Sequence, residues 1–347
     1  MGFPEKHRQK SKRFEKLLSD PPATCWIYWC IGLVFCSCLL SSFSWGFSAH
    51  RRIHEAAIHM VPHPLYAFFK KHEDWIVEHA VDADRRKHNV QGEDIKHYID
   101  LDRYASSAEI LYEIFPLTWQ EALNRYGEDV VRDNGIAIWN IEWTYNRLVE
   151  SFVNRDIGEI LRQATDLGHY ISDLHVPLHT TENYNGQLTG QDGIHGLWET
   201  QIAEAEMHAY SLVGLGGVSP IDVREWAVQV ALASHGMVDS VLDTERILTA
   251  SWEGASHAYV ERGRVRQRLR SPAYVAEYSS RLNGMVERRM QQSVKSLAGL
   301  WWQAWLDAGE PDLFTQETEV EEDQVGNSLW KALRKRWSMF RWKKHEQ

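Results

Sequence analysis

Apolar residues recur every three or four positions over most of the chain, which is the spacing of one buried helix face. The pattern predicts helices over 51–82 (broken at Pro62 and Pro64), 103–113, 117–126, 135–176 (broken near Arg155 and Asp156), 197–210, 220–250 and 272–308. The sequence shows no sustained strand alternation, no internal repeat and no glycine-rich phosphate loop. We therefore expect an all-α protein with a single compact multi-helix domain.

Two polar segments interrupt the helical pattern. Residues 83–100 are expected to form a loop that ends in Lys-His-Tyr-Ile-Asp. The Gly- and Asn-rich residues 181–195 are expected to form a second loop.

Two pairs of a histidine and a carboxylate flank the second loop. His169 and Asp173 are four residues apart on a predicted helix, so they share one of its faces. His195 and Glu199 have the same spacing, and His179 lies between the two pairs. Apolar residues interleave with these polar ones, and burying several ionisable groups without a partner is costly. Imidazole and carboxylate ligands without thiolate suit a hydrolytic zinc site, so this block predicts bound zinc.

A single pair of this kind is weak evidence, because helices more often carry such pairs as solvated or capped surface groups. The second pair and His179 strengthen the metal hypothesis. His175 lies only two residues from Asp173 and is expected to point elsewhere, as a packed or supporting histidine.

Charge and composition limit the classes of partner. The 347 residues carry a formal net charge of −10, although the first 44 hold six Lys and Arg against three acidic residues. The remainder is therefore strongly acidic and a poor general binder of polyanions. Any phosphate recognition should be local, with metal ions supplying the positive charge. Sixteen tryptophans indicate a well-filled helical core.

The N-terminal segment has the order of a secretory signal. A basic stretch precedes an apolar run at 25–40, and small residues follow up to Ser44. We expect residues 1–44 to be a signal peptide, and the mature protein to be secreted or to lie in the periplasm or cell envelope. An uncleaved membrane anchor is the alternative. All four cysteines lie within 25–38, so a cleaved chain has no disulfide.

The C-terminal segment 314–347 is first acidic and then basic. Five acidic residues lie within 317–323, and seven Lys or Arg lie within 331–344, interleaved with tryptophans at helical spacing. A basic amphipathic helix of this composition can lie on an anionic membrane surface. The alternatives are a helix folded back on the acidic body and a disordered, solvated tail. No protein partner is predicted.

Three motifs together resemble a known superfamily. They are Trp45-Gly-Phe-Ser-Ala-His50, His97-Tyr-Ile-Asp100 and the block 169–199. Their order and spacing, over roughly residues 45–310, resemble the superfamily that unites zinc-dependent phospholipase C with single-strand-specific zinc nucleases. The resemblance implies a zinc-dependent phosphoesterase domain over 45–313, built around a trinuclear zinc site.

The resemblance also implies a ligand set for three zinc ions. One ion would take His97, His169, Asp173 and either Asp84 or Asp82; a second would take backbone atoms of Trp45 and the side chain of His50, with Asp173 as a bridge; the third would take His179, His195 and Glu199. Asp84 fits the phospholipase pattern, whereas Asp82 lies at the nuclease-like distance from His97, and we prefer Asp84. This aspartate would orient the attacking water or act as a general base.

The resemblance implies hydrolysis of phosphate esters by a zinc-activated hydroxide. We predict phospholipase C-like activity on phospholipid phosphodiesters, because Glu199 and the short gap from His179 to His195 resemble the phospholipase branch. The opening Trp-Gly-x-x-x-His resembles the nuclease branch, so a single-strand nuclease or 3′-nucleotidase acting on nucleotide phosphodiesters is the alternative. Tyr184 in the second loop could contact either substrate, or have no ligand role.

A further alternative is a zinc-binding envelope protein without turnover. Structural zinc sites usually close with four protein ligands and favour cysteine, which argues against it. A di-iron bundle would need paired Glu-x-x-His motifs on separate helices, and His54-Glu55 does not supply one.

Overall fold

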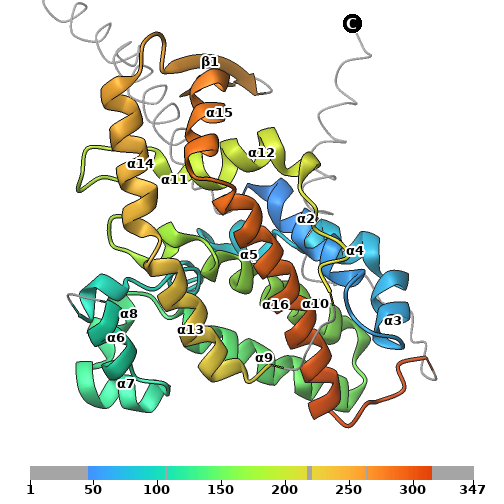
Figure 1. Ribbon diagram of the computed structural model, residues 1–347. Coiled ribbons are helices and arrows are strands. Elements are labelled where there is room, and N and C mark those ends of the chain that lie inside the picture. Colours follow the sequence, from blue (N-terminus) through green and yellow to red (C-terminus); the bar gives the residue numbers. More distant parts are fainter. Residues whose placement is uncertain (1–45, 106–107, 217–220, 263–264, 315–347) are drawn as a thin grey trace, which may run out of the picture. The chain divides into compact units, whose positions relative to one another are not determined.

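The computed structural model describes residues 46–105, 108–216, 221–262 and 265–314, and most regular structure within them is helical (Figure 1). The predicted signal 1–44, Trp45 and the tail beyond Phe314 lie outside the described residues. Within the part of the chain that is described, no helix combines the length and the apolar content that crossing a membrane requires.

Short helices precede two long ones in the first part of the chain. Their bounds are α2 (Phe47–Ile58), α3 (Leu65–Lys71), α4 (Glu73–His79), α5 (Asp82–Arg86), α6 (Ala108–Ile114), α7 (Trp119–Tyr126), α8 (Glu128–Asp133), α9 (Ala137–Asn154) and α10 (Ile157–Leu174), with the 3-10 turns η2 (Asp94–Lys96), η3 (Leu101–Arg103) and η4 (Pro177–Thr180). After these come α11 (Ile194–Gly196), the π-helical η5 (Leu197–Ile202), α12 (Ala203–Glu206), η6 (Met207–Ala209), α13 (Val223–His235), α14 (Val238–Ser251), the strands β1 (His257–Arg262) and β2 (Val265–Arg270), α15 (Pro272–Arg281) and α16 (Met285–Asp307).

Helices α9 and α10 form a tightly connected helical hairpin, broken where the sequence predicts. Arg155 ends α9 in the left-handed conformation (φ 55°), and the Asp156 carboxylate accepts the backbone N–H of Glu159 to cap α10. The long helix α16 packs against α2, α9 and α10, as Figure 1 shows. The core between them includes the fully buried Trp139 and Trp301.

The long predicted helices are divided where the backbone turns. The proline break is present, because α2 ends at Ile58 and α3 begins at Leu65. The stretch predicted over 272–308 is interrupted by Asn283 and Gly284, both in the left-handed region (φ 50° and 71°). Asn and Gly adopt that conformation at the lowest steric cost, so they separate α15 from α16.

Four elements depart from the expectation. Helix α5 begins the segment predicted as a loop over 83–100, and α8 was not predicted; each is short and buries few side chains, so apolar periodicity does not reveal it. Strands β1 and β2 pair antiparallel from His257↔Arg270 to Arg262↔Val265, although no strand was expected. Their sequence alternates arginines with apolar and polar residues on a hairpin that is largely exposed, so it lacks the pattern of a half-buried strand. The fold is therefore mostly helical, with one small two-stranded hairpin added to the expected helices.

Candidate metal centre

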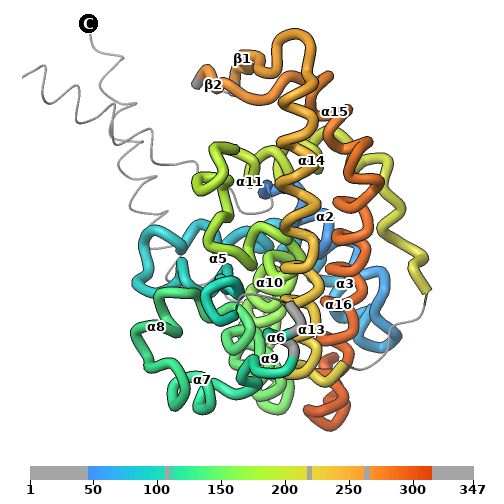
Figure 2. The backbone as a smooth tube through the Cα atoms, turned by 60° about the vertical axis from the view of Figure 1, so that its left-hand side comes forward, coloured from blue at the N-terminus to red at the C-terminus, as the bar shows by residue number. Residues whose placement is uncertain are grey.

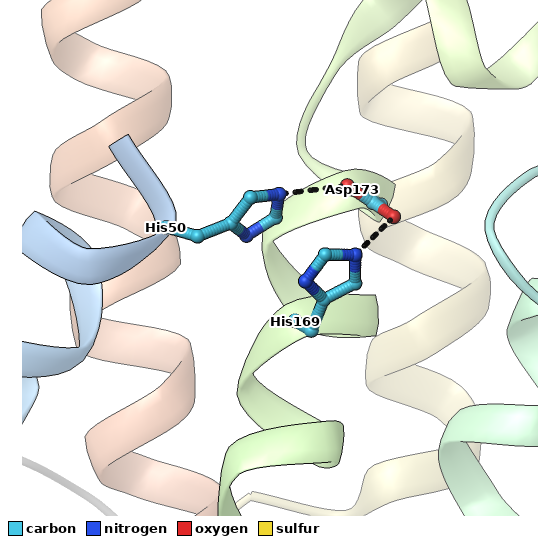
Figure 3. A group of neighbouring side chains, drawn as sticks. All are labelled: His50, His169 and Asp173. Atoms are coloured by element: carbon cyan, nitrogen blue, oxygen red, sulfur yellow. Dashed lines mark ion pairs between the residues drawn. The ribbon is translucent and has the colours of Figure 1, made fainter. Parts of the chain in front are cut away.

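Helix α10 supplies the middle of a buried group of histidines and carboxylates. His169 and Asp173 lie one turn apart on it, as their spacing predicts. His50 approaches Asp173 from α2 (Figure 3), and His97 follows η2. All four side chains are at most 1% exposed, so their charges must be balanced within the protein.

Asp173 is shared between two sets of side chains. Its Oδ1 lies 3.4 Å from Nε2 of His50. Its Oδ2 lies 3.4 Å from Nε2 of His169 and 2.7 Å from Nδ1 of His97. The rings of His50 and His169 stack with their centroids 3.9 Å apart. One carboxylate thus faces both sets, which is the arrangement of a bridging ligand.

The structure separates the two candidate aspartates. Asp84 is buried, and its Oδ1 lies 3.5 Å from Nε2 of His169 and 3.9 Å from Nδ1 of His97. Asp82 pairs instead with Nη1 of Arg85 at 2.7 Å and is partly exposed. Asp84, His97 and His169 therefore form one group of the size of a metal site, and Asp82 lies outside it.

His179, His195 and Glu199 form a third group, with candidate ligand atoms within 4.8 Å of one another. Nε2 of His179 lies 3.3 Å from one carboxylate oxygen of Glu199, and Nε2 of His195 lies 3.0 Å from the other. Glu199 belongs to the π-helical η5, a geometry found often at functional sites. The side chain of His195 is 14% exposed, so this group opens toward solvent.

These separations fit metal coordination. Ligand atoms bonded at about 2.0–2.1 Å around a tetrahedral zinc lie roughly 3.3–3.4 Å from one another. Most of the distances from His Nε2 to a carboxylate oxygen here are 3.3–3.5 Å. Both carboxylate oxygens of Asp84, Nε2 of His169 and Oε1 of Glu199 are buried and make no hydrogen bond. Such atoms cost about 1–3 kcal/mol each when unsatisfied, and cations held between them would remove that cost.

Hydrogen bonds to the backbone orient three of the rings. Nδ1 of His169 lies 2.9 Å from the carbonyl oxygen of Ala80, and Nδ1 of His179 lies 2.6 Å from that of His97. Nδ1 of His195 lies 3.2 Å from the carbonyl oxygen of Tyr184. A ring that donates from Nδ1 presents the lone pair of Nε2 to the site, as ligating histidines do.

The pKa values of the buried histidines are shifted in opposite directions. Burial lowers the pKa of His97 to about 4 and also lowers the pKa of His50, so both rings are neutral at pH 7, as metal ligands must be. Burial acts in the same direction on His169, but Asp173 and Asp84 outweigh it and hold the pKa of His169 well above its ordinary value. Burial alone would raise the pKa of Asp84, yet His169 outweighs it and brings that pKa to about 2. A proton on His169 therefore balances carboxylates that a metal ion could balance instead.

Close packing brings α2 to α10. A Cβ atom on Gly168 would lie 2.3 Å from Nε2 of His54, so only glycine leaves room for that ring. His54 in turn bonds through Nδ1 to the carbonyl oxygen of His50 at 2.8 Å. Gly168 thus permits the approach that places His50 beside Asp173, a role that its sequence context does not reveal.

A partly buried charged network stands behind His97. It consists of Arg86, Glu93, Lys96, Asp166 and Tyr170. Burial raises the pKa of Glu93, but hydrogen bonds from Lys96 and Tyr170 outweigh it and lower that pKa to about 2. The ring of Tyr170 meets His97 edge-on at 5.4 Å between centroids, so the network buttresses a candidate ligand. No motif or spacing in the sequence marks these residues.

The remaining predicted positions fall as follows. His175 is buried away from the three groups, with Nδ1 2.8 Å from the carbonyl oxygen of Ile171, as expected of a packed histidine. Trp45 lies outside the described residues, so its ligand role stays a prediction.

The next residue, Gly46, is buried against Thr200, since a Cβ atom there would lie 3.0 Å from Thr200 Cγ2. The described chain therefore starts beside η5, which carries Glu199.

Comparison with known proteins adds no family. No family model matches the chain, and no curated protein matches it. The structure itself shows a mostly helical chain with three largely buried groups of histidine and carboxylate side chains that could hold metal ions.

Proposed function

We propose that the chain is a secreted zinc-dependent hydrolase of phosphate esters that holds three zinc ions. The observation that carries the proposal is the position of Asp173. Its carboxylate contacts His50 on one side and His97 and His169 on the other. The group of His179, His195 and Glu199 is a further candidate metal site. Two ions bridged by one carboxylate are typical of enzymes that displace a group at phosphorus. The resemblance of the motifs to zinc-dependent phospholipases and nucleases supports the same chemistry.

The proposal assigns a place to each ion. His97, His169, Asp84 and Asp173 would hold the first; His50, Asp173 and backbone atoms of Trp45 would hold the second; His179, His195 and Glu199 would hold the third. Zinc in these places would polarise a phosphoryl oxygen and lower the pKa of bound water toward about 7. The third group offers three side chains and opens to solvent at His195, as catalytic zinc sites do. This argues against a purely structural role.

The side chains themselves would position the reactants. Asp84 has a pKa near 2, so it is ionised at neutral pH and can accept a hydrogen bond from the attacking water. Because its pKa is low, its carboxylate is a weak base, so it is better suited to orienting the water than to taking its proton. The third group would face the phosphate and the leaving oxygen from the solvent side, where a substrate can enter.

For the substrate we propose phospholipid, with phospholipase C-like cleavage. The support is the pairing of Glu199 with both His179 and His195, which matches the phospholipase-like ligand pattern. The alternative, a single-strand nuclease or 3′-nucleotidase, is favoured by Tyr184. Its ring is 54% exposed and meets His195 edge-on at 5.8 Å between centroids, where a base could stack.

A hydrolysis panel tests the proposal. The full chain is expressed with its N-terminal segment, the mature protein is purified, and its first residue is determined; Trp45 is expected. With zinc present, it is offered phosphatidylcholine and other phospholipids, single-stranded DNA, RNA and mononucleotides. Release of diacylglycerol and phosphorylated headgroup supports the phospholipase assignment, whereas release of nucleotides moves the protein to the nuclease branch.

Metal content separates enzyme from structural protein. About three zinc ions per chain together with turnover agree with the proposal. One zinc ion and no turnover on any substrate would indicate a zinc-binding envelope protein, and bound iron would contradict both.

A further inference from the structure

The β1–β2 hairpin has one basic face. In its register, Tyr259 lies opposite Arg268, and Glu261 lies opposite Arg266, so these four side chains share a face. Both arginines are exposed, and the ring of Tyr259 is 64% exposed. Glu261 is the single acidic residue among them. A cationic surface thus stands on a protein whose net charge is −10.

The root of the hairpin is fixed to the helical body. Arg270 bonds through Nη2 to Oε1 of Glu245 in α14 at 2.6 Å, and its guanidinium lies 4.5 Å from the ring centroid of Tyr274 in α15. Both views show the hairpin beyond the ends of α14 and α15 (Figures 1 and 2). The strand that carries the distal arginines is therefore anchored to the helical body at its base.

The same root contacts the segment that carries a candidate zinc ligand. Nε2 of Gln191 donates to Oε2 of Glu245 at 2.7 Å, and Gln191 lies four residues before His195. His195 is the ligand through which the third group opens to solvent. Figure 2 shows α11, which carries His195, in the half of the molecule that bears the hairpin, so a surface held by the hairpin would lie near this opening.

The chemistry of the face favours a lipid surface over nucleic acid. The guanidinium of Arg266 already lies over the ring of Tyr259 at 4.4 Å from its centroid. One face of the ring is therefore occupied by the guanidinium, which leaves fewer ring faces on which a base could stack. An edge-exposed tyrosine flanked by arginines suits the headgroup region of an anionic bilayer, where basic residues bind phosphates and tyrosine sits at the interface.

We propose that Arg266, Arg268 and Tyr259 dock the protein on anionic phospholipid surfaces and so deliver the metal centre to lipid substrate. The inference extends the proposed phospholipase function. Charge complementarity drives it, because the chain as a whole is acidic, whereas this face of the hairpin is basic and attracts an anionic surface.

The test compares two double variants of the full chain. Arg266→Gln with Arg268→Gln removes two exposed arginines from the hairpin, and Arg132→Gln with Arg162→Gln removes two exposed arginines (49% and 48%) from α8 and α10. Binding is measured by co-sedimentation with vesicles of phosphatidylcholine alone or mixed with phosphatidylserine, over a range of salt. Hydrolysis is measured on the same vesicles and on a short-chain, monomeric phosphatidylcholine.

The hairpin variant should bind mixed vesicles roughly 30-fold more weakly, because each basic residue near such a surface contributes about 1 kcal/mol. It should lose vesicle hydrolysis in proportion and keep hydrolysis of the monomeric lipid, and the control should behave as the unchanged protein. Equal vesicle binding by the hairpin variant and the unchanged protein would overturn the proposal. So would a selective loss of single-stranded DNA binding. If no phospholipid is hydrolysed by any form, the proposed function fails, and vesicle binding still decides the docking surface.

Discussion

Helix α10 and the β1–β2 hairpin carry charge in opposite ways. On α10, His169 and Asp173 are buried, and each contacts other ionisable groups at fixed distances. On the hairpin, Arg266 and Arg268 are exposed and face solvent. A buried charge is stable only with particular partners in a particular geometry, whereas an exposed charge acts through its sign and is screened by salt.

The contrast predicts two kinds of response to mutation. A change in the buried groups should act in an all-or-none way, should depend on pH and should be insensitive to salt. A change on the hairpin should be graded, additive and salt-dependent, with little effect on folding.

Asp173→Asn should lower hydrolysis by about a thousand-fold or more. The substitution keeps the shape but removes the charge that the structure places between His50 and His169, and the lost stabilisation amounts to several kcal/mol. Zinc content, measured by elemental analysis, should fall together with activity. Unchanged activity at full zinc content would refute the assignment of Asp173 as the bridge.

The two neighbouring aspartates should differ sharply. Asp84→Asn should lower activity by about a hundred-fold, because Asp84 contacts His169 and His97 inside the protein. Asp82→Asn should change activity less than about two-fold, because Asp82 forms an exposed pair with Arg85. The two variants are matched in chemistry and lie two residues apart. A larger loss in the Asp82 variant, measured as kcat/KM, would exchange their roles.

The metal-free protein should lose stability above neutral pH. A histidine whose pKa is raised by folding stabilises the protein fully below its unfolded pKa, near 6.5, and this contribution is lost as pH rises toward the folded value. Asp173 and Asp84 raise the pKa of His169 against the effect of burial. The Tm of the metal-free protein should therefore fall from pH 6.5 to 8.5.

Zinc should remove that loss, because the ion replaces the proton on His169 and binds more tightly as the competing proton is withdrawn. Thermal unfolding with chelator and with excess zinc, in parallel buffers, measures the difference. A parallel decline of both forms above pH 6.5 would show that the titrating group lies elsewhere.

The sequence predicts α10 better than it predicts its surroundings. The i,i+4 spacing of His169 and Asp173 places both on one helix face, and the apolar residues between them bury that face. The preference for Asp84 over Asp82 depended on the resemblance alone, because the two lie at the boundary between the predicted helix 51–82 and the predicted loop 83–100, where the structure has a short helix. Two residues of difference on that helix turn one carboxylate inward and leave the other on the surface.

Contacts between distant segments leave no local pattern. Arg86 and Asp166 pair at 2.9 Å although they are 80 positions apart, so no spacing rule brings them together. The hairpin was missed for a related reason. At its base, Arg270 contacts Glu245 and Tyr274, and farther along its side chains are largely exposed. No alternation of apolar and polar residues therefore marks the two strands in the sequence.

Two glycines on α10 offer a matched test of packing. Gly168→Ala should destabilise the protein by about 1–3 kcal/mol, because the new Cβ atom would lie 2.3 Å from His54 Nε2. Gly158→Ala meets only Asp156 Oδ1, at 3.6 Å, and should stabilise by up to about 1 kcal/mol. Urea unfolding of both variants measures the difference. Equal stability of the two would mean that α2 does not approach α10 as closely as the contact with His54 requires.

The smallest effect should come from the hairpin. Arg266→Gln removes a contact with the exposed ring of Tyr259, worth about 0.5–1 kcal/mol at such sites, and Arg268→Gln should change the free energy of unfolding by less than about 0.5 kcal/mol. Zinc content should not change in either variant, because neither arginine contacts the candidate ligand groups. Urea unfolding and elemental analysis check both statements. A loss of several kcal/mol would mean that these arginines hold the fold together, and weaker vesicle binding by the double variant would then report misfolding rather than lost charge.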